Sequence, residues 1–468
     1  MAGLTAAKVL LHAGRSFVVL EAQNRIGGRA WADANFETPI DLGGAWIHAV
    51  ESNPLAPIVI GSGRKTQPTN TNAADHIYFN GRFANERERA LFSCIQEKLE
   101  ENLGNAAHPN IGDRNPDEAA AMADYGPASK HMPDEKACAE KVKLLKKGDA
   151  SFAQMRDLVS QNAGPLEAGV TLANNSTLDA ADFAAGNDSL IDGGFGGFVA
   201  AYGREVETNV KLSTKVVGIQ HGGALTAVTT EAGATLYAKK TLVTVSTGVL
   251  AKGIIKFDPP LDDQKTAAIK NLPMGLLNKA ILQFDPKTMK YPTDRNTSLD
   301  DRWVLYGGNL KDPTDDMAFV FRPMHTNIII AFVGAERAEE LEKAPVKDGH
   351  TEFEALALKA LGEMCQCDAK AARVKATTTS WGTSSISFGA YSAARPADKD
   401  YRITLAAPIH DRVYFAGEAC YNTTYNGSFA AAYSSALKTA IEMIGGLCAT
   451  EKPENLTQER GCALVRAK

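Results

Sequence analysis

The sequence of 468 residues predicts an α/β protein in which a Rossmann-like domain is interleaved with an α+β domain built on a mixed sheet. Residues 2–13 have the pattern of a helix, and residues 15–22 that of the strand which follows it. A continuous apolar run at 241–245 is typical of a strand buried on both faces of a parallel sheet. Strand-like runs between 280 and 333, followed by an amphipathic helix at 352–364, predict a second sheet.

The first helix and strand carry the latter part of a dinucleotide-binding fingerprint. Gly3 opens the helix, where a glycine lets the helix approach the sheet closely, and Glu21 ends the strand, where a carboxylate can accept ribose hydroxyls. The alternative for Glu21 is a solvated acid at a strand end. The first strand and first two glycines of the G-x-G-x-x-G motif do not precede Gly3. We expect an in-frame segment upstream of Met1 to encode them; a true truncation would bind the nucleotide poorly.

The later segments return the chain to the first domain. A glycine turn at 191–198 enters a helix, residues 206–212 and 215–219 are predicted strands, and residues 225–238 form a predicted hairpin. A strand at 413–418 and a helix at 430–445 complete the domain. The predicted boundaries are 1–62, 185–265 and 375–448 for the Rossmann-like domain, 63–184 and 266–374 for the second domain, and 449–468 for a tail. Within the second domain, residues 112–149 are predicted to form exposed helices or a mobile flap.

Bulk composition excludes several classes of function. A net charge of −5 and a pI near 6.0 give no electrostatic basis for binding nucleic acid or an anionic membrane. No apolar stretch approaches the ~20 residues of a membrane-spanning helix. Seven cysteines at irregular spacing predict reduced thiols and a cytoplasmic location, with Cys365-Gln366-Cys367 too tight for a C-x-x-C redox pair. The sequence predicts no metal site and leaves the oligomeric state open.

Two glycine turns carry candidate ligand-binding residues. The first contains Arg25, Gly28 and Arg29, and its arginine donor fork and accessible backbone amides suit a pyrophosphate, although Gly-Gly pairs also form ordinary turns. The second, residues 42–48, ends on His48. A neutral imidazole there could orient or deprotonate a cationic substrate, or could simply be satisfied by loop carbonyls.

Lys279 is the sharpest catalytic candidate. It begins an apolar strand that runs inward, and a lysine is costly to bury unless it is paired or functional. A desolvated ammonium has a lowered pKa and could exchange protons at working pH. The alternative is a lysine at the mouth of a strand that reaches solvent.

The motifs, taken in order, resemble those of the flavin-containing amine oxidases, the monoamine and polyamine oxidases. The sequence at residues 46–48 and 53–57 is most similar to that of the polyamine oxidase branch. The resemblance spans nearly the whole chain and rests on these motifs: Glu21 with Arg25-x-Gly27-Gly28-Arg29, Leu42-Gly43-Gly44-x-Trp46-Ile47-His48 with Asn53-Pro54-Leu55, Gly275-x-x-x-Lys279, Trp381 with Gly389-x-Tyr391-Ser392, and Phe415-Ala416-Gly417-Glu418.

The resemblance implies an FAD-dependent enzyme that oxidises the C–N bond of a small amine to an imine and reduces O2 to H2O2. It implies that Lys279 holds a water near flavin N5, that Tyr391 forms one wall of an aromatic cage for the amine, and that His48 anchors the substrate. The cofactor residues that it implies, together with those predicted above, are Gly3, Glu21, Arg25, Gly28, Arg29, Gly43, Gly44, Ala45, Trp46, Val216, Trp381, Glu418 and Ser428.

Two departures from the family pattern bear on function. Ser428 stands where the cage usually has a second aromatic wall, which indicates either a more polar or larger amine or a lost oxidase activity. Ala390 stands where monoamine oxidases carry the flavin-linked cysteine, so FAD is expected to bind non-covalently. The alternatives are another FAD-dependent oxidation on the same fold, such as desaturation of an apolar substrate, or a truncated non-catalytic relative.

Overall fold

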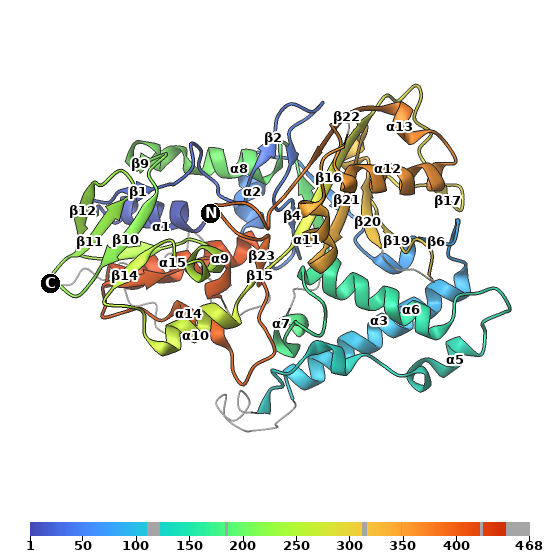
Figure 1. The fold of residues 1–468 in the computed structure, drawn as a ribbon, viewed down its shortest axis with the longest axis horizontal. Helices are drawn as coiled ribbons and strands as arrows, with labels where there is room; N and C mark the ends of the chain where they lie inside the picture. Colours follow the sequence, from blue (N-terminus) through green and yellow to red (C-terminus); the bar gives the residue numbers. More distant parts are fainter. Residues whose placement is uncertain (110–121, 183–185, 311–315, 348, 422–424, 446–468) are drawn as a thin grey trace.

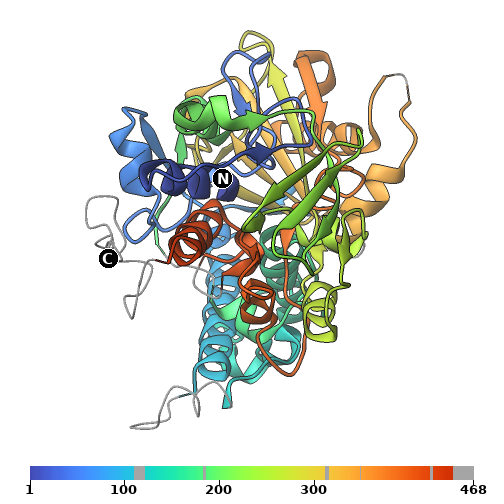
Figure 2. The same cartoon turned by 90° about the vertical axis from the view of Figure 1, so that its left-hand side faces the viewer.

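The computed structural model describes residues 1–109, 122–182, 186–310, 316–347, 349–421 and 425–445, and it has two lobes (Figure 1). The α/β lobe, on the left of Figure 1, contains the chain start and the closing helix. The sheet lobe, on the right, contains a large mixed sheet with a group of helices below it. The chain crosses between the lobes several times, as the colours in Figure 1 show, and Figure 2 views the molecule from the side of the α/β lobe. This interleaving confirms the predicted fold class.

The α/β lobe is assembled from segments that are distant in sequence. Helix α1 (Ala2–His12) packs against α15 (Phe429–Met443) through alanines, whose small side chains allow a close approach of the two helices. The paired strands are β1 (Val19–Leu20) with β9 (Val210–Lys211) and β13 (Thr241–Val243) with β24 (Val413–Phe415), both parallel, and the four-stranded sheet in the order β12 (Thr235–Ala238), β11 (Thr226–Thr230), β10 (Val216–Gln220), β14 (Lys256–Asp258). The predicted hairpin is the antiparallel pair β11 and β12.

The remaining elements of this lobe border the sheet lobe or cover its own strands. They are β2 (Ala32–Asp33), β3 (Ile40–Asp41), β4 (Trp46–Ile47), α2 (Ala56–Gly61), β5 (Thr66–Thr69), β8 (Asp188–Ile191), α8 (Gly194–Gly203), α9 (Thr247–Ala251), α10 (Asp263–Asn271), β15 (Met274–Gly275), β23 (Tyr391–Ser392) and α14 (Tyr401–Ala406). Helix α8 follows the glycine turn, as predicted from the sequence.

Two predicted strands of this lobe are corrected. The sequence predicts a strand at 206–212, but residues 206–209 belong to a 3-10 helix over Arg204–Asn209, and only Val210–Lys211 pair as β9. The turn is anchored because Val206 is buried and Glu205 pairs with Lys8 of α1 at 3.1 Å. The strand predicted at 15–22 is likewise reduced to Val19–Leu20.

The sheet lobe contains a seven-stranded sheet in the order β22-β16-β21-β20-β19-β6-β7. Its β19–β6 pair is parallel and its other pairs are antiparallel, so the sheet is mixed as predicted. Helices α11 and α12 belong to the apolar cluster on one face, and α6 belongs to that on the other. The bounds are β6 (Ile77–Phe79), β7 (Arg82–Phe83), β16 (Leu277–Phe284), β17 (Thr293–Asp294), β18 (Thr297–Ser298), β19 (Trp303–Tyr306), β20 (Met317–Phe321), β21 (Ile328–Gly334), α11 (Ala335–Lys343), α12 (Glu352–Cys365), α13 (Ala369–Ala372) and β22 (Arg373–Thr378).

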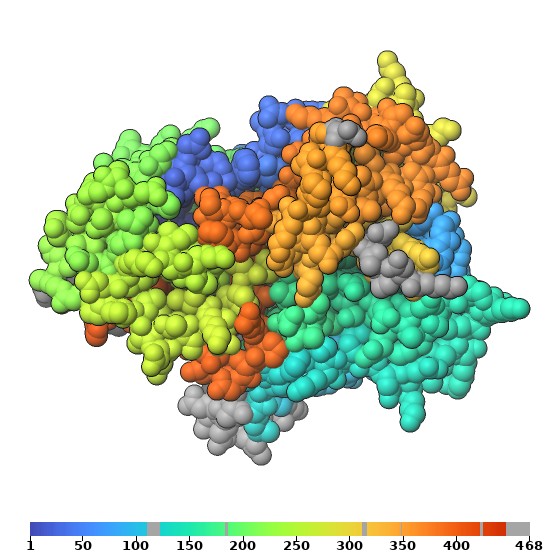
Figure 3. All heavy atoms as spheres, viewed as in Figure 1, coloured from blue at the N-terminus to red at the C-terminus, as the bar shows by residue number. Residues whose placement is uncertain are grey.

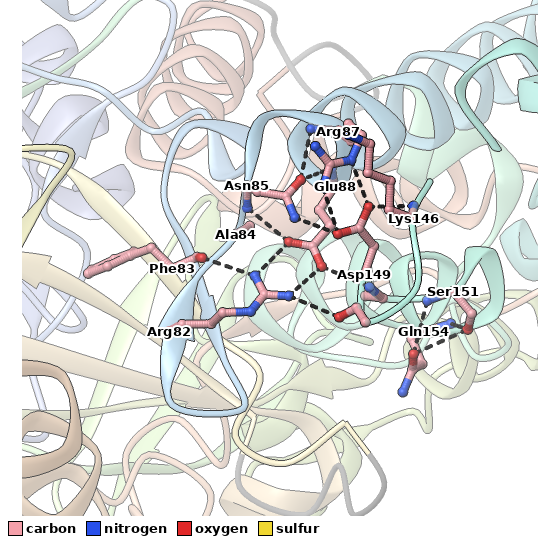
Figure 4. Close-up of polar contacts among 12 residues, drawn as sticks. Arg82, Phe83, Ala84, Asn85, Arg87, Glu88, Lys146, Asp149, Ser151 and Gln154 are labelled. Atoms are coloured by element: carbon pink, nitrogen blue, oxygen red, sulfur yellow. Dashed lines mark hydrogen bonds and ion pairs between the residues drawn. The ribbon is translucent and has the colours of Figure 1, made fainter. Parts of the chain in front are cut away.

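A buried carboxylate fixes the helical part of this lobe to the edge of the sheet. The helices are α3 (Glu86–Ala107), α5 (Ala139–Val142), α6 (Phe152–Gln161) and α7 (Thr177–Ala181). Glu88 of α3 is fully buried and accepts two bonds of 2.7 Å from Arg82 of β7, together with the backbone N–H of Asn85 and of Ala150 (Figure 4). Arg87 pairs with Asp149 beside it. We call this cluster the Glu88 network.

The prediction of reduced thiols is wrong for four cysteines. Cys94 of α3 is disulfide-bonded to Cys138, and Cys365 to Cys367, while Cys420 is free. Of the predicted flap at 112–149, residues 112–121 lie outside the described residues, and the rest forms short helices that the first disulfide ties to α3. The disulfides also remove one of the observations on which the cytoplasmic prediction rested.

Candidate active site

A cavity of about 1000 Å³ is bounded by both lobes. Figure 3 shows the two lobes meeting in space-filling form, with the α/β lobe at the left and the helices of the sheet lobe at the lower right. The cavity brings together all of the predicted site residues except Gly3 and Arg25: Glu21, Gly28, Arg29, Gly43, Gly44, Ala45, Trp46, His48, Val216, Lys279, Trp381, Tyr391, Glu418 and Ser428.

The two exceptions lie beside the cavity rather than on its wall. Arg25 donates to the carbonyl of Gly28 at 2.8 Å, and its guanidinium lies 4.7 Å from the centre of the Trp31 ring. The Arg25 side chain therefore stabilises the backbone of this glycine loop without lining the cavity. Gly3 lies in α1, where an added Cβ would be 3.4 Å from Thr244 Oγ1. A close approach of helix and strand is what the sequence predicts for this glycine.

At the nucleotide end, Arg29 joins two segments that are far apart in sequence. Its Nη1 donates to the carbonyl of Ala390 at 2.9 Å and to Glu418 Oε1 at 2.8 Å. Burial raises the pKa of Glu418, but Arg29 and Arg402 more than offset this, so the net pKa lies below its usual range. Glu418 is thus held as a buried carboxylate on the cavity wall.

The second glycine turn leaves no room for side chains. An added Cβ on Gly43 would lie 1.7 Å from the carbonyl oxygen of Arg29, and one on Gly44 would lie 2.8 Å from the Phe429 ring. These contacts are below the distance that real Cβ atoms tolerate. The backbone of this turn therefore passes directly along the first glycine loop, which places Trp46 on the cavity wall.

Lys279 lies in the interior and does not reach the outside of the molecule. Its Nζ donates to the carbonyl of Asp41 at 2.9 Å and to that of Gly43 at 2.5 Å, and the Trp46 and Phe332 rings lie 5.9 and 5.6 Å away. The residue is 5% exposed. Burial lowers its pKa to about 8, although the Asp41 carboxylate opposes the shift. Its amine can therefore change protonation state near neutral pH.

Asp41 was not identified from the sequence as a site residue. Its carboxylate is buried at the start of α8, where it accepts the backbone N–H of Phe195 at 2.8 Å and of Gly196 at 3.0 Å. Burial raises its pKa to about 6 against the opposing charge of Lys279. The available signal was an acid directly before the glycine turn.

Tyr391 lines the cavity from β23. Its hydroxyl donates to the backbone carbonyl of Glu167 at 2.6 Å, and burial raises its pKa. An added Cβ on Gly427 would lie 3.3 Å from the Tyr391 ring. Ser428 is the N-cap of α15, accepting the backbone N–H of Ala431 at 3.3 Å, and its own hydroxyl donates to the Tyr425 carbonyl. The place of the second aromatic wall is therefore taken by a capping hydroxyl.

His48 is paired with a carboxylate. Its Nδ1 lies 3.1 Å from Asp188 Oδ2, and Asp188 Oδ1 accepts the backbone N–H of Ala49 at 3.1 Å. Asn53 donates from its side chain to the His48 carbonyl at 2.7 Å. Asp188 of β8 thus fixes the orientation of the imidazole at the cavity wall.

Sequence reasoning also missed a cluster of carboxylates on the cavity wall near His48. Glu100 of α3, Glu167 and Asp188 all line the cavity. Much of Glu167 is open, but the open surface faces the cavity, and burial raises its pKa to about 7 even though Asn162 donates to it at 2.5 Å. The only sequence signal was the pair Gln96 and Glu100, four residues apart and hence on one helix face.

Trp381 and Val216 complete the predicted set. The indole N–H of Trp381 donates to the Leu42 carbonyl at 3.2 Å, and its backbone N–H donates to Asn278 Oδ1 at 3.1 Å. Val216 begins β10 and lines the cavity with Thr214. Within the described ranges, no group of three or more His, Cys, Asp or Glu side chains could hold a metal ion. In that same part of the chain no helix has both the length and the apolar character to cross a membrane.

Residues 1–444 match the family model of flavin containing amine oxidoreductases. The chain belongs to this family. It is 28% identical to polyamine oxidase 4 of Oryza sativa subsp. japonica over 94% of this chain and 86% of that protein. It is also 28% identical to polyamine oxidase 2 of Arabidopsis thaliana, over 94% and 85%. A structure of wild-type putrescine oxidase bound to putrescine superposes with a TM-score of 0.71 at 17% identity, covering 95% of this chain and 97% of that one.

The predictions of the family, the enzyme class and the FAD cofactor are thereby confirmed, and the cavity fits FAD. Glu21, which follows β1, would accept ribose hydroxyls, and Arg29 with the Gly28 backbone, on the wall of the same cavity, would hold the pyrophosphate. Two buried polar atoms of residues on the cavity wall, Trp46 Nε1 and Asn426 Oδ1, have no hydrogen-bond partner among the described residues. Ala390 presents no thiol, as expected for a non-covalent flavin.

Proposed function

We propose that this FAD-dependent enzyme oxidises the CH–NH bond of an amine that carries a second positive charge, a diamine or polyamine, to the imine, with O2 reduced to H2O2. The observation that carries the proposal is the set of carboxylates Glu100, Glu167 and Asp188 on the cavity wall. We call the part of the cavity that they line the amine end. The polyamine oxidase relatives agree with this substrate class.

The ionised form of these carboxylates would be stabilised by cations, and among the described residues the cavity wall provides a hydrogen-bonded neighbour of this kind only for Asp188. His48 faces Asp188, and Lys279 contacts backbone carbonyls nearer the glycine turns. A buried carboxylate is stabilised by an ammonium within about 4–6 Å, which also lowers the pKa of the carboxyl group. A second ammonium on the substrate would bring Glu167 from its pKa of about 7 into the charged state. A monoamine would leave that carboxylate with the neutral amide of Asn162 and without an ammonium.

Each side chain has a role in this proposal. FAD, when bound, supplies the acceptor for the hydride removed from the carbon next to the amine. Tyr391 presents its ring to the amine, which an aromatic face attracts when it is cationic. His48, oriented by Asp188, can hold or accept the amine proton. Lys279, with its pKa of about 8, can hold a water and exchange protons during imine hydrolysis or flavin reoxidation.

The test uses the FAD-loaded protein and substrates matched in length. Putrescine and butylamine have the same number of carbons and differ by one ammonium. We expect putrescine to bleach the oxidised flavin absorbance without oxygen, and to release H2O2 in air, at least about tenfold more efficiently than butylamine. Equal efficiency would contradict the role of the second charge. A flavin that no amine reduces would leave the alternatives, another oxidation on this fold or a non-catalytic relative.

A further inference from the structure

Arg402 is a buried charge that no role above accounts for. It lies in α14, is 1% exposed, and makes two bonds with Asp179: Nε to Oδ1 at 2.9 Å and Nη2 to Oδ2 at 2.6 Å. Its Nη1 donates to Ser392 Oγ at 2.7 Å, and its Nη2 donates to the Ser392 carbonyl at 3.2 Å. An arginine of this kind is costly to bury, so its position needs a reason.

The bonds continue from Arg402 to the cofactor end of the cavity. Because Ser392 Oγ accepts from Arg402, its own proton is directed to Glu418 Oε2, at 2.5 Å. The backbone N–H of Ser392 donates to Glu418 Oε1 at 3.1 Å, and the same oxygen accepts from Arg29 at 2.8 Å. The orientation of Glu418 on the cavity wall therefore depends on Ser392, which Arg402 holds.

The same bonds hold the backbone on both sides of Tyr391. Ser392, the next residue, is fixed by Arg402 and Glu418, and Ala390, the preceding residue, accepts from Arg29. Tyr391 lines the cavity, and its ring lies beside Gly427. Its place is thus set from two sides by one connected cluster.

Asp179 brings the helical part of the sheet lobe into this cluster. It lies in α7, which packs against α3 and whose Ala180 and Ala181 line the cavity. Besides Arg402, Asp179 accepts the backbone N–H of Ala394 at 2.7 Å and the side-chain amide of Asn426 at 3.1 Å. Asn426 also lines the cavity, two residues before the N-cap of α15.

We propose that Asp179 and Arg402 are positioning residues that, through Ser392, fix Glu418 for FAD and Tyr391 for the amine at the same time. The Asp179 network, defined as Asp179, Arg402, Ser392, Glu418 and Arg29, then couples the amine end of the cavity to the cofactor end. Its effect on the amine rests on the proposed function, whereas its effect on FAD does not.

The test compares variants of this network with one of the Glu88 network. Asp179→Asn keeps the shape and removes the charge opposite Arg402, and Ser392→Ala removes only the relay hydroxyl and leaves the Asp179–Arg402 pair intact. Glu88→Gln is the matched control, because Glu88, like Asp179, binds an arginine through two nitrogens, but none of the residues to which Glu88 is bonded lines the cavity. The measurements are the dissociation constant of FAD well below the melting temperature, the visible spectrum of the bound flavin, and KM and kcat for putrescine.

We expect Asp179→Asn and Ser392→Ala to weaken FAD binding, Asp179→Asn by about tenfold, and to raise the KM for putrescine more than they lower kcat. Glu88→Gln should lower the melting temperature and leave the FAD dissociation constant and spectrum unchanged. Wild-type FAD affinity in both Asp179→Asn and Ser392→Ala would overturn the proposal, and if Asp179→Asn does not fold, Ser392→Ala decides it. If wild-type enzyme oxidises no amine, the proposed function fails, but the FAD measurement still decides whether Asp179 and Arg402 position Glu418 for the cofactor.

Discussion

The Glu88 network and the Asp179 network are built from the same parts and end in different places. In each, a carboxylate whose side chain is largely buried binds an arginine through two nitrogens and accepts backbone N–H donors, two of them at Glu88 and one at Asp179. The Glu88 network closes on the start of α3 and the turn at Ala150 (Figure 4). The Asp179 network continues through Ser392 to Glu418 on the cavity wall. A buried ion pair alone therefore does not mark a functional site; its connection to a cavity does.

The largest expected effect separates chemistry from stability at the cavity. Lys279→Met should lower the rate of amine-dependent turnover about a hundredfold, because it removes the buried amine that can exchange protons with the substrate and its product. Near pH 7 the variant should be no less stable than wild type, because the change removes two bonds to carbonyls but also removes the cost of burying an ammonium whose pKa is lowered to about 8. Stopped-flow kinetics and denaturant unfolding measure the two quantities. Wild-type turnover in this variant would contradict the role of Lys279.

The pH dependence of wild type gives the sign of the Lys279 effect. Its folded pKa of about 8 lies below that of an unfolded lysine, so between these values the unfolded chain binds more protons. The contribution of Lys279 to stability is therefore least favourable below pH 8 and improves as pH rises above it. Compared with Lys279→Met, wild type should gain stability from pH 8 to 10; a parallel pH profile for both proteins would refute the buried amine.

The next prediction concerns the Glu88 network, where a change should lower stability and leave turnover unchanged. Glu88→Gln should lower the free energy of unfolding by about 2 kcal/mol, because Arg82 and two backbone N–H groups lose a charged acceptor while Arg82 stays partly solvated. The turnover number of the folded fraction should equal that of wild type. Urea unfolding and active-site titration of flavin test this, and a loss of FAD affinity would break the distinction between the two networks.

The smallest effect sharpens the assignment of the amine end. Glu167 has a raised pKa of about 7, so its carboxylate is neutral below that pH and attracts a second ammonium above it. The KM for putrescine should therefore fall, by up to about tenfold, as pH rises through 7. In Glu167→Gln this dependence should disappear, and the KM for butylamine should change little. A putrescine KM that keeps its slope in the variant would place the second charge elsewhere.

Much of the fold could be predicted from local sequence pattern. The predicted apolar runs at 304–307, 317–321 and 327–333 lie within one residue of β19, β20 and β21, and the run at 280–284 covers all but the first three residues of β16, because strands buried on both faces need continuous apolar residues. The prediction of a strand at 206–212 was wrong for residues 206–209, because the ion pair of Glu205 with Lys8, a tertiary contact, favours a 3-10 turn there. The disulfide between Cys94 and Cys138 was missed because this pairing depends on the fold, which brings the two residues together across 44 positions of the sequence.

The residues of the site also fall into those that local sequence pattern identifies and those that only the fold brings together. Residues in glycine-rich turns could be identified because their spacing is local and the family motifs are specific, as for Arg29 and His48. Asp179 and Arg402, separated by 223 residues, have no local signal, because each would serve equally well as a surface charge. Glu167 lies in a π-helical turn containing Pro165, and only the packing of that turn against the cavity shows that its carboxylate faces inward.

The most direct test of the proposed function is the rate of anaerobic flavin reduction by putrescine and by butylamine, measured in wild type and in Glu167→Gln. The structure predicts that wild type is reduced at least about tenfold more efficiently by putrescine and that the variant loses most of this preference. Efficient reduction of both proteins by both amines, with no preference in wild type, would contradict the assignment of the carboxylate cluster as the site of a second ammonium.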